Sequence, residues 1–441
     1  MKAKIDGNSI SYLRNICSGK LADYYPAGIP DAAWGRLEKE LGYVEKTDSM
    51  DAWRIYYEFN EVAKKNQSLI TIRGTSNNTL LAFLLGNTPF DPLSAYYYCP
   101  KCGHYETIGE CTFGIDADEK KCPDCGEKLE KRGYNLNEVF AWGESEPFKD
   151  CGFMYDYPHS LKEFLRTTLK RLYSQNEIVE YLDRTYIDGK ISISMGGYAI
   201  LPAGKDAITD YPHLVSYNEN GVVVFEGGYI DYADGDIMLI SAFENETINT
   251  IMKMQEKTGI YYYEMEIDKR NSCVPRALVN TNLISDEEEI ALSFKDKANV
   301  FQMAELFAIA HNTYSLFEED EPDANDQIYA SVLREDMFEL PADERFFTRE
   351  TLYERLLSLG LNEHDAFVCT EFVRKGKVKD TKRWRDMAEQ YKVPNDICEF
   401  CEGYRYMWTR AYGLLNYFLL SICAEYQKIN PALYMKTISE P

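Results

Sequence analysis

Residues 70–103 read ITIRGTSNNTLLAFLLGNTPFDPLSAYYYCPKCG. The segment predicts a buried strand over 69–72, a turn that starts at Arg73, and a helix over 79–85. It ends in CPKCG, a Cys-x-x-Cys turn of the kind that presents two thiolates to a metal ion. The stretch therefore combines a strand, a helix and a metal knuckle.

A second knuckle, CPDCG, follows at residues 122–126. In each knuckle the backbone amides point at the thiolate sulfurs, and the glycine takes the tight conformation that the turn needs. Four thiolates form a closed tetrahedral set, which is the preferred environment of a structural rather than a catalytic Zn²⁺. We therefore predict one structural zinc ion bound by Cys99, Cys102, Cys122 and Cys125.

The remaining cysteines are expected to be reduced thiols. Twelve cysteines in a chain that we expect in the cytoplasm indicate thiols and metal ligands rather than disulfides. Cys398, Cys401 and Cys423 fall in an apolar helical stretch. Core packing is therefore the expected role of these three, and a second metal or redox site is the alternative.

Length and composition indicate a folded protein of several units. The chain has 441 residues, of which 45% are hydrophobic and 14% aromatic. This length suggests about two to four units. No run of apolar residues is long enough to span a membrane, and the first residues lack the apolar core of a secretory signal. A cytoplasmic protein without a membrane partner is expected.

The net charge of −24 disfavours nucleic-acid binding over the surface as a whole, because phosphate contacts need Lys and Arg. A local basic surface can still coexist with an acidic exterior. The runs RKGKVK at 374–379 and KRWR at 382–385 are the candidates for such a surface. A solvated helix end or loop is the alternative interpretation of each run.

Hydrophobic periodicity predicts a β-rich centre between helical segments. Helical patterns cover 35–66 and 161–182, and strands are expected in the middle of the chain, notably at 222–225 and 237–240. From residue 242 onward the pattern is helical. The helices expected there lie at 246–257, 297–314, 324–334, 348–359, 363–374, 380–391, 394–405 and 409–428.

Six blocks of sequence, in one order, resemble the palm and fingers of PolC-type DNA polymerase III alpha subunits, the C-family bacterial polymerases. The first block is the 70–103 stretch, and the second runs from the CPDCG knuckle to Asp150. The others are MGGYAILPAG (195–204), IMLISAFENETINTIMKMQEKTGI (237–260), AFVCTEFVRKGKVK (366–379) and the stretch 404–435. The resemblance implies an α+β fold. It would consist of a palm with a mixed sheet, an inserted zinc ribbon with four cysteine ligands and a mostly helical fingers-like domain.

The same resemblance implies a division of the chain into five parts. They are an N-terminal segment (1–34), a first part of the palm (35–98), the zinc ribbon (99–130), a second part of the palm with a reduced thumb (131–260) and the helical fingers-like domain (261–441).

The chain departs from the family at the residues that carry its chemistry. Where the family has an Asp-x-Asp pair for two Mg²⁺ ions, the chain has Asp150 and Gly152, and Ser241 falls where a third carboxylate is expected. Two-metal phosphoryl transfer needs several carboxylate oxygens fixed a few Å apart. Asp150 is therefore vestigial, Mg²⁺ is not expected as a cofactor, and no catalytic residue is predicted.

Two further departures concern nucleotide contacts. The turn after Arg73 carries Asn77 and Asn78, which are bulkier than the Gly and Ser of the family where a backbone would approach a triphosphate. A Lys-x-His region of the family's fingers reads Arg410-Ala411-Tyr412 in this chain.

The prediction that follows is an inactive, PolC-like pseudo-polymerase that binds nucleic acid or a replication-related partner. DNA, a nucleotide and a replication protein are all open as that partner. The expected phosphate-facing residues are Arg73, Arg374, Lys375 and Lys377, with surface solubility as the alternative role of each.

Two alternatives stay open at this point. The first is a minimal DNA polymerase that uses Asp150 with Asp156 and one of Asp231, Asp234 or Asp236. The second is a protein–protein interaction module, which the acidic surface and the 34 tyrosines favour because Tyr is enriched at interfaces.

Overall fold

The computed structural model describes residues 10–109, 112–143, 153–173, 177–187, 190–218, 220–226, 237–265, 298–310, 313–314, 348–374 and 376–439. The chain forms two compact units that alternate along the sequence. The sheet unit comprises Met1–Ser76, Leu80–Pro89 and Pro147–Lys253. The ribbon-helix unit comprises Asn77–Thr79, Phe90–Glu146 and Met254–Pro441. The five-part division made from the sequence stays a prediction.

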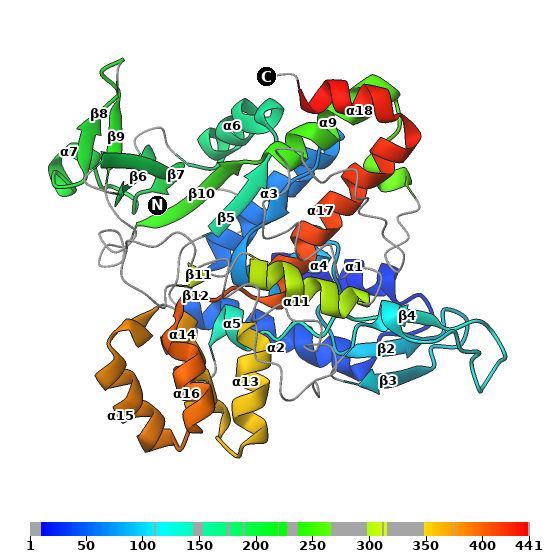
Figure 1. Cartoon of the computed structure of the whole chain (residues 1–441). Helices are drawn as coiled ribbons and strands as arrows, with labels where there is room; N and C mark the ends of the chain where they lie inside the picture. The colour runs from blue at the N-terminus through cyan, green and yellow to red at the C-terminus, as the bar shows by residue number, and fades with distance from the viewer. Residues whose placement is uncertain are drawn as a thin grey trace. The chain divides into compact units, whose positions relative to one another are not determined.

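A seven-stranded mixed sheet organises the sheet unit (Figure 1). Its strand order is β1-β5-β10-β7-β6-β9-β8. The strands are β1 Thr71–Ile72, β5 Phe153–Tyr157, β6 Ile178–Ile187, β7 Lys190–Ile200, β8 Val215–Tyr217, β9 Val223–Glu226 and β10 Met238–Glu244. β10 runs parallel to β5, and β6 runs parallel to β9, whereas the other neighbours are antiparallel. The mixed sheet predicted from the family resemblance is confirmed.

Helices of the sheet unit bury apolar residues at helical spacing. They are α1 Ile10–Tyr24, α2 Asp31–Thr47, α3 Met50–Lys65, α4 Leu80–Leu84, α6 Lys162–Leu172 and α7 Ala207–Asp210. The helical pattern across 35–66 comes as two helices, α2 and α3. Asp48 separates them, because its left-handed backbone (φ 52°) ends α2.

The two faces of the sheet have different surroundings. On one face Tyr155 packs against Tyr56 and Phe59 of α3, with ring centroids 4.8 and 5.1 Å apart. Successive residues of a strand point to opposite sides of the sheet. The strand residues next to those on the Tyr155 side therefore point to the opposite face. An apolar cluster on that opposite face includes Val179, Tyr181, Ala199, Leu201, Phe225, Ile237 and Leu239.

The ribbon-helix unit combines a small antiparallel sheet with a set of packed helices. The three-stranded sheet, in the order β3-β2-β4, consists of β2 Ala95–Tyr98, β3 Tyr105–Gly109 and β4 Glu130–Arg132. A two-stranded sheet pairs β11 Thr313–Tyr314 with β12 Tyr404–Tyr406. The helices are α5 Val139–Trp142, α11 Val300–Ala310, α13 Arg349–Ser358, α14 Glu363–Arg374, α15 Thr381–Tyr391, α16 Asn395–Glu402, α17 Arg410–Ile429 and α18 Pro431–Ile438. Helix α9, Glu246–Thr258, follows β10 and crosses the boundary between the units.

The predicted α+β class is confirmed, and three helix predictions are partly wrong. The helices expected over 297–314 and 394–405 end earlier, at Ala310 and Glu402, because Thr313–Tyr314 and Tyr404–Tyr406 pair as β11 and β12. The third is the helix expected over 161–182. Helix α6 ends at Leu172, and residues from Ile178 onward form β6 instead of a continued helix. Cross-strand pairing of β6 with β7 and β9 explains this difference, because the β-branched Ile178 and Val179 suit a pleated strand. The helix expected at 324–334 lies outside the described residues. Within the part of the chain that the structure describes, no helix is both long and apolar enough to cross a bilayer.

Candidate functional site

The four cysteines of the two knuckles meet at the end of the three-stranded sheet. Their Sγ atoms all lie within 4.8 Å of one another. The closest pairs are Cys99 with Cys125 and Cys102 with Cys122, each 3.5 Å between sulfurs. Four sulfur donors at this spacing fit a tetrahedral metal ion that prefers soft ligands. The structure therefore brings together all four residues that were predicted as metal ligands.

Local backbone geometry presents these sulfurs. The amide of Gly103 donates to the carbonyl of Cys99, and the amide of Gly126 donates to the carbonyl of Cys122, both over 2.9 Å. The two glycines have φ values of 78° and 75°, a region that favours glycine. Burial of the Cys99 thiol opposes its ionisation, but backbone amides of the same knuckle donate hydrogen bonds to the sulfur and lower the pKa of Cys99 to about 7. For Cys102 a backbone hydrogen bond at His104 favours the thiolate, but burial and the neighbouring sulfurs outweigh it and raise the pKa of Cys102 to about 12. The knuckle thus favours the thiolate at Cys99 and disfavours it at Cys102.

His104 lies beside the knuckles. Its Nδ1 is 2.7 Å from a carboxylate oxygen of Asp124, and the same carboxylate lies close to Cys122. The four sulfurs already form a complete tetrahedral set, so His104 is placed to orient its neighbours rather than to complete the ligand set.

In the sheet unit, β10, which contains Ser241, lies beside β5, the strand that follows Asp150 and Gly152 in the sequence. β5 begins at Phe153, immediately after Asp150 and Gly152, which lie outside the described residues. β5 pairs in parallel with β10, and Met154 is the partner of Ser241. Ser241 is therefore a direct neighbour of β5 in the sheet. The acids Asp231, Asp234 and Asp236 also lie outside the described residues.

Ser241 is bonded within the sheet. Tyr181, Gly197 and Ser241 are partners across three neighbouring strands, β6, β7 and β10. The hydroxyls of Tyr181 and Ser241 are hydrogen-bonded to each other in a buried position. Gly197 lies between them without a side chain, and a Cβ there would come within 2.0 Å of the carbonyl oxygen of Ile240. The tyrosine can therefore reach across the glycine to the serine.

Asp156 is paired with Arg73. The Nε of Arg73 donates to both carboxylate oxygens of Asp156, at 3.0 and 2.9 Å. The guanidinium also lies over the ring of Phe243, 4.3 Å from its centroid. The Asp156 side chain is only 4% exposed and that of Arg73 is 25% exposed. The carboxylate of Asp156 is thus already paired with a cation of the protein itself, the guanidinium of Arg73.

Another internal carboxylate lies at the start of α4. Glu40, which is fully buried, accepts hydrogen bonds from the amides of Leu80 and Leu81, each over 2.9 Å. Burial raises the pKa of Glu40, while Arg36, whose Nε lies 2.6 Å away, and the two amides lower it. Glu40 therefore binds the amide groups that follow the RGTSNN turn.

Within the ribbon-helix unit, Asn78 is bonded to the protein as well. Its side-chain amide donates to the carbonyl of Asn137 over 3.0 Å and to Glu350 over 3.1 Å. Both Asn77 and Asn78 are fully buried. The side chain of Asn78 is therefore bonded within the protein, and the effect of Asn77 and Asn78 on nucleotide contacts stays a prediction.

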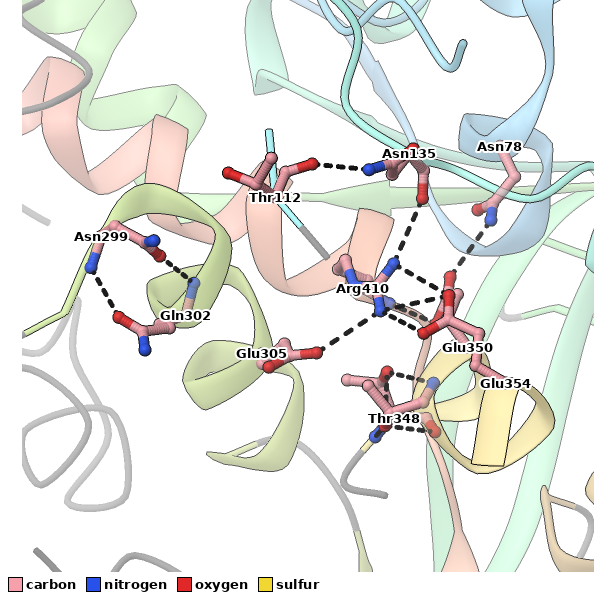
Figure 2. Close-up of polar contacts among 11 residues, drawn as sticks. Asn78, Thr112, Asn135, Asn299, Gln302, Glu305, Thr348, Glu350, Glu354 and Arg410 are labelled. Atoms are coloured by element: carbon pink, nitrogen blue, oxygen red, sulfur yellow. Dashed lines mark hydrogen bonds and ion pairs between the residues drawn. The ribbon is translucent and has the colours of Figure 1, made fainter. Parts of the chain in front are cut away.

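Arg410 is the centre of a buried charge cluster (Figure 2). Its guanidinium contacts Glu305 of α11 at 3.4 Å and Glu354 of α13 at 3.3 Å, and it donates to the carbonyl of Asn135 over 3.2 Å. Its backbone amide donates to Glu350 over 2.8 Å. Burial alone would lower the pKa of Arg410, but the three carboxylates raise it. Arg410 thus holds α11, α13 and α17 together by charge.

Arg374 takes part in a second buried cluster. It contacts Glu371 at 2.7 Å, and Arg349 forms an ion pair with the same carboxylate. Burial opposes ionisation of Glu371, but the two guanidinium groups lower its pKa to about 2. Lys377 is exposed, and Lys375 lies outside the described residues. Of the predicted phosphate-facing residues, Arg73 and Arg374 therefore have internal carboxylate partners, and the phosphate-binding role of all four stays a prediction.

The cysteines near the C-terminus are core residues. Cys398, Cys401 and Cys423 are buried, and burial raises the pKa of each thiol. Raised pKa values disfavour the thiolate that metal binding and redox chemistry need.

The sequence comparisons find similarity to bacterial DNA polymerase III. The family described as the bacterial DNA polymerase III alpha NTPase domain matches residues 11–130. This range includes helices α1 to α4 and the ribbon. The chain is therefore related to bacterial DNA polymerase III alpha subunits.

Curated relatives narrow this class to the PolC type. The "DNA polymerase III PolC-type" of Caldanaerobacter subterraneus subsp. tengcongensis is 21% identical over 95% of the chain, and that of Bacillus subtilis is 22% identical over 98%. In Lacticaseibacillus paracasei the identity rises to 32%, over 31% of the chain. The chain is thus a divergent relative of PolC-type DNA polymerase III. The chain covers 33% of the length of each of the first two relatives, so it spans about a third of those proteins.

Proposed function

We propose that the chain is a catalytically silent relative of PolC-type DNA polymerase III that binds nucleic acid. The observation that carries the proposal is Ser241. At the position where the family resemblance expects a third carboxylate, the chain has a hydroxyl that is bonded to Tyr181 beside an apolar cluster. A serine hydroxyl does not supply the charge with which carboxylates hold two Mg²⁺ ions.

The pair of Arg73 and Asp156 supports the same proposal. A minimal polymerase would need Asp156 as a metal ligand together with Asp150 and a further acid. Asp156 is nearly buried and bonded to Arg73 through both oxygens. A metal ion would have to displace this guanidinium, and removing one partner from a buried ion pair is energetically unfavourable.

The nucleic-acid part of the proposal rests on relatives and on local charge. The proteins that match over nearly the full chain are named DNA polymerases. Lys377 is exposed within a basic stretch of an otherwise acidic chain. We further propose that Zn²⁺ is the ion of the four-cysteine ribbon and that it is structural, because four thiolates leave no open position for a substrate.

Primer extension tests the catalytic part. With Mg²⁺ or Mn²⁺ and a labelled template-primer, the unmodified protein should give no product above background, and neither should an Asp150→Ala variant. Phosphoryl transfer depends almost wholly on positioned charges, so the fold has little activity to supply without them. Templated product that disappears in Asp150→Ala would contradict the proposal and favour the minimal polymerase.

Fluorescence anisotropy with labelled DNA at low salt tests the binding part. Affinity should be independent of sequence and should fall as salt rises, with a log–log slope of about −0.7 to −0.9 per phosphate contacted. If neither single-stranded nor duplex DNA binds, the nucleic-acid part is wrong and a protein partner is favoured.

A further inference from the structure

Three aromatic rings form a strip where β12 leads into α17. The ring centroids of Tyr406 and Trp408 are 4.9 Å apart, and those of Trp408 and Tyr412 are 3.9 Å apart with nearly parallel planes. Tyr412 is buried, whereas Tyr406 and Trp408 are each partly exposed. The buried ring therefore supports two rings that reach the surface.

Cationic side chains lie beside this aromatic strip. The guanidinium of Arg374 lies over the ring of Tyr406, 5.9 Å from its centroid. The short 3₁₀ helix Lys377–Lys379 packs beside both β12 and α14, and its two lysines are exposed. Exposed lysines and partly exposed aromatic rings thus share one surface of the ribbon-helix unit.

The charge of this surface differs from that of the whole chain. Residues 374–385 contain seven Lys or Arg and a single Asp, in a chain whose net charge is −24. Arg349 and Arg374 both form ion pairs with the carboxylate of Glu371. The position of Arg374 is fixed by this shared carboxylate, so its charge stays close to Tyr406.

We propose that this aromatic-basic surface, made of Arg374, Lys377, Lys379, Tyr406 and Trp408, binds single-stranded nucleic acid. The inference rests on the proposed nucleic-acid binding and names its partner and place. Unpaired bases stack on aromatic side chains, while Lys and Arg beside them contact the phosphates. In a duplex the base faces are already stacked on one another, so the rings of Tyr406 and Trp408 gain nothing from it. The surface therefore discriminates single strands from duplexes.

The test compares a labelled oligothymidylate of about 20 nucleotides with a duplex of the same length. Tyr406→Leu and Trp408→Leu should each weaken binding of the single strand about tenfold, because base stacking on one ring contributes about 1–3 kcal/mol. Duplex binding should change little. Tyr406→Phe keeps the ring and should bind as the unmodified protein does. Tyr263→Leu, which removes a ring that is 55% exposed in the same unit, should also have no effect.

The salt dependence tests the cationic half of the surface. The quantity measured is the slope of log affinity against log salt concentration for the single strand. Lys377→Gln combined with Lys379→Gln should reduce the magnitude of this slope by about 0.7 for each phosphate that the variant no longer neutralises. Lys436→Gln, an exposed lysine of α18, is the matched control and should leave the slope unchanged. Inorganic polyphosphate, which has no bases, should compete weakly against the oligothymidylate.

Circular dichroism must first show that each variant is folded. If Trp408→Leu does not fold, Tyr406→Leu still tests the proposed surface. The proposed surface is wrong if folded Tyr406→Leu and Trp408→Leu bind the single strand as the unmodified protein does, or weaken single-strand and duplex binding equally. That result would leave the proposed function intact. Absence of any DNA binding by the unmodified protein would contradict the proposed function itself.

Discussion

The four-cysteine ribbon and the polymerase-like positions use their polar side chains in different ways. In the ribbon, four sulfurs lie within 4.8 Å of one another, and four thiolates so close repel until a cation neutralises them. At Ser241, Asp156 and Arg410 the partner is instead a side chain of the same chain. The ribbon is thus arranged for a ligand, whereas the side chains at the other three positions are bonded to other side chains of the protein.

This difference bears on the proposed loss of catalysis. A buried polar group that is bonded internally helps to specify the fold. It can serve a ligand only if its internal bond is broken first, which leaves the former partner buried and unsatisfied. Side chains bonded in this way therefore contribute to the stability of the fold. The following substitutions test whether the stability of each region depends on a bound ligand or on bonds within the protein.

Removal of the metal should have the largest effect. Cys99→Ser combined with Cys125→Ser should lose the metal, about one zinc ion per chain by elemental analysis, and should lower the unfolding temperature markedly. The reason is that metal binding supplies folding free energy, about 10–16 kcal/mol in small zinc-binding peptides. A strong chelator should reproduce the effect in the unmodified protein.

Cys17→Ala is the matched control for this prediction. Cys17 is a buried thiol of α1 in the sheet unit, away from the knuckles in sequence. The variant should lose only about 1 kcal/mol of stability by leaving a small cavity, and it should retain the metal. Metal retained by the double serine variant would show that the four cysteines are not the ligands.

Loss of the buried guanidinium should have the next largest effect. Arg410→Met leaves Glu305 and Glu350, which are 3% and 1% exposed, without their buried cation. The free energy of unfolding should fall by about 3–5 kcal/mol, as for other buried ion pairs that lose one partner. Urea unfolding measures this change.

An exposed ion pair provides the comparison for Arg410. Arg385 contacts Glu402 at 2.6 Å, but its side chain is 62% exposed. Arg385→Gln should therefore lower stability by less than about 1 kcal/mol. If Arg410→Met is as stable as the unmodified protein, Arg410 is not bound into the fold as the structure implies, and the contrast with the ribbon disappears.

The ribbon could be predicted from the sequence because its signal is local. Each knuckle is a five-residue motif in which two cysteines and a glycine determine the backbone and the ligands together. The fold has only to bring two such turns into contact. The helices from α13 to α17 were predictable for a similar reason, since each shows its own periodicity.

The partners of the polymerase-like positions could not be predicted because they are distant in sequence. Arg73 and Asp156 are separated by 83 positions, and Tyr181 and Ser241 by 60. Tyr181 also lies where a helix was expected, and only the pairing of β6 with β7 places it in the row that contains Ser241. The absence of an acid at 241 could be read from the sequence, whereas the residue that bonds to Ser241 could not.

The smallest effect is expected at Ser241, where a double-mutant cycle measures the bond to Tyr181. Ser241→Ala should cost about 1–3 kcal/mol, because the phenol hydroxyl remains buried without its partner. Tyr181→Phe should cost about 1 kcal/mol. The double variant should be less destabilised than the sum of the two, with a coupling of about 1 kcal/mol by chemical denaturation.

The size of this coupling decides whether the sheet is satisfied from within at the position of the missing acid. A coupling near zero would mean that the two hydroxyls do not depend on each other, so that Ser241 would be as available to a ligand as the cysteines of the ribbon are. A clear coupling would mean that an acid restored by Ser241→Asp must compete with the tyrosine beside an apolar cluster. Burial disfavours a charged carboxylate there, so Ser241→Asp alone should restore neither tight Mn²⁺ binding nor primer extension.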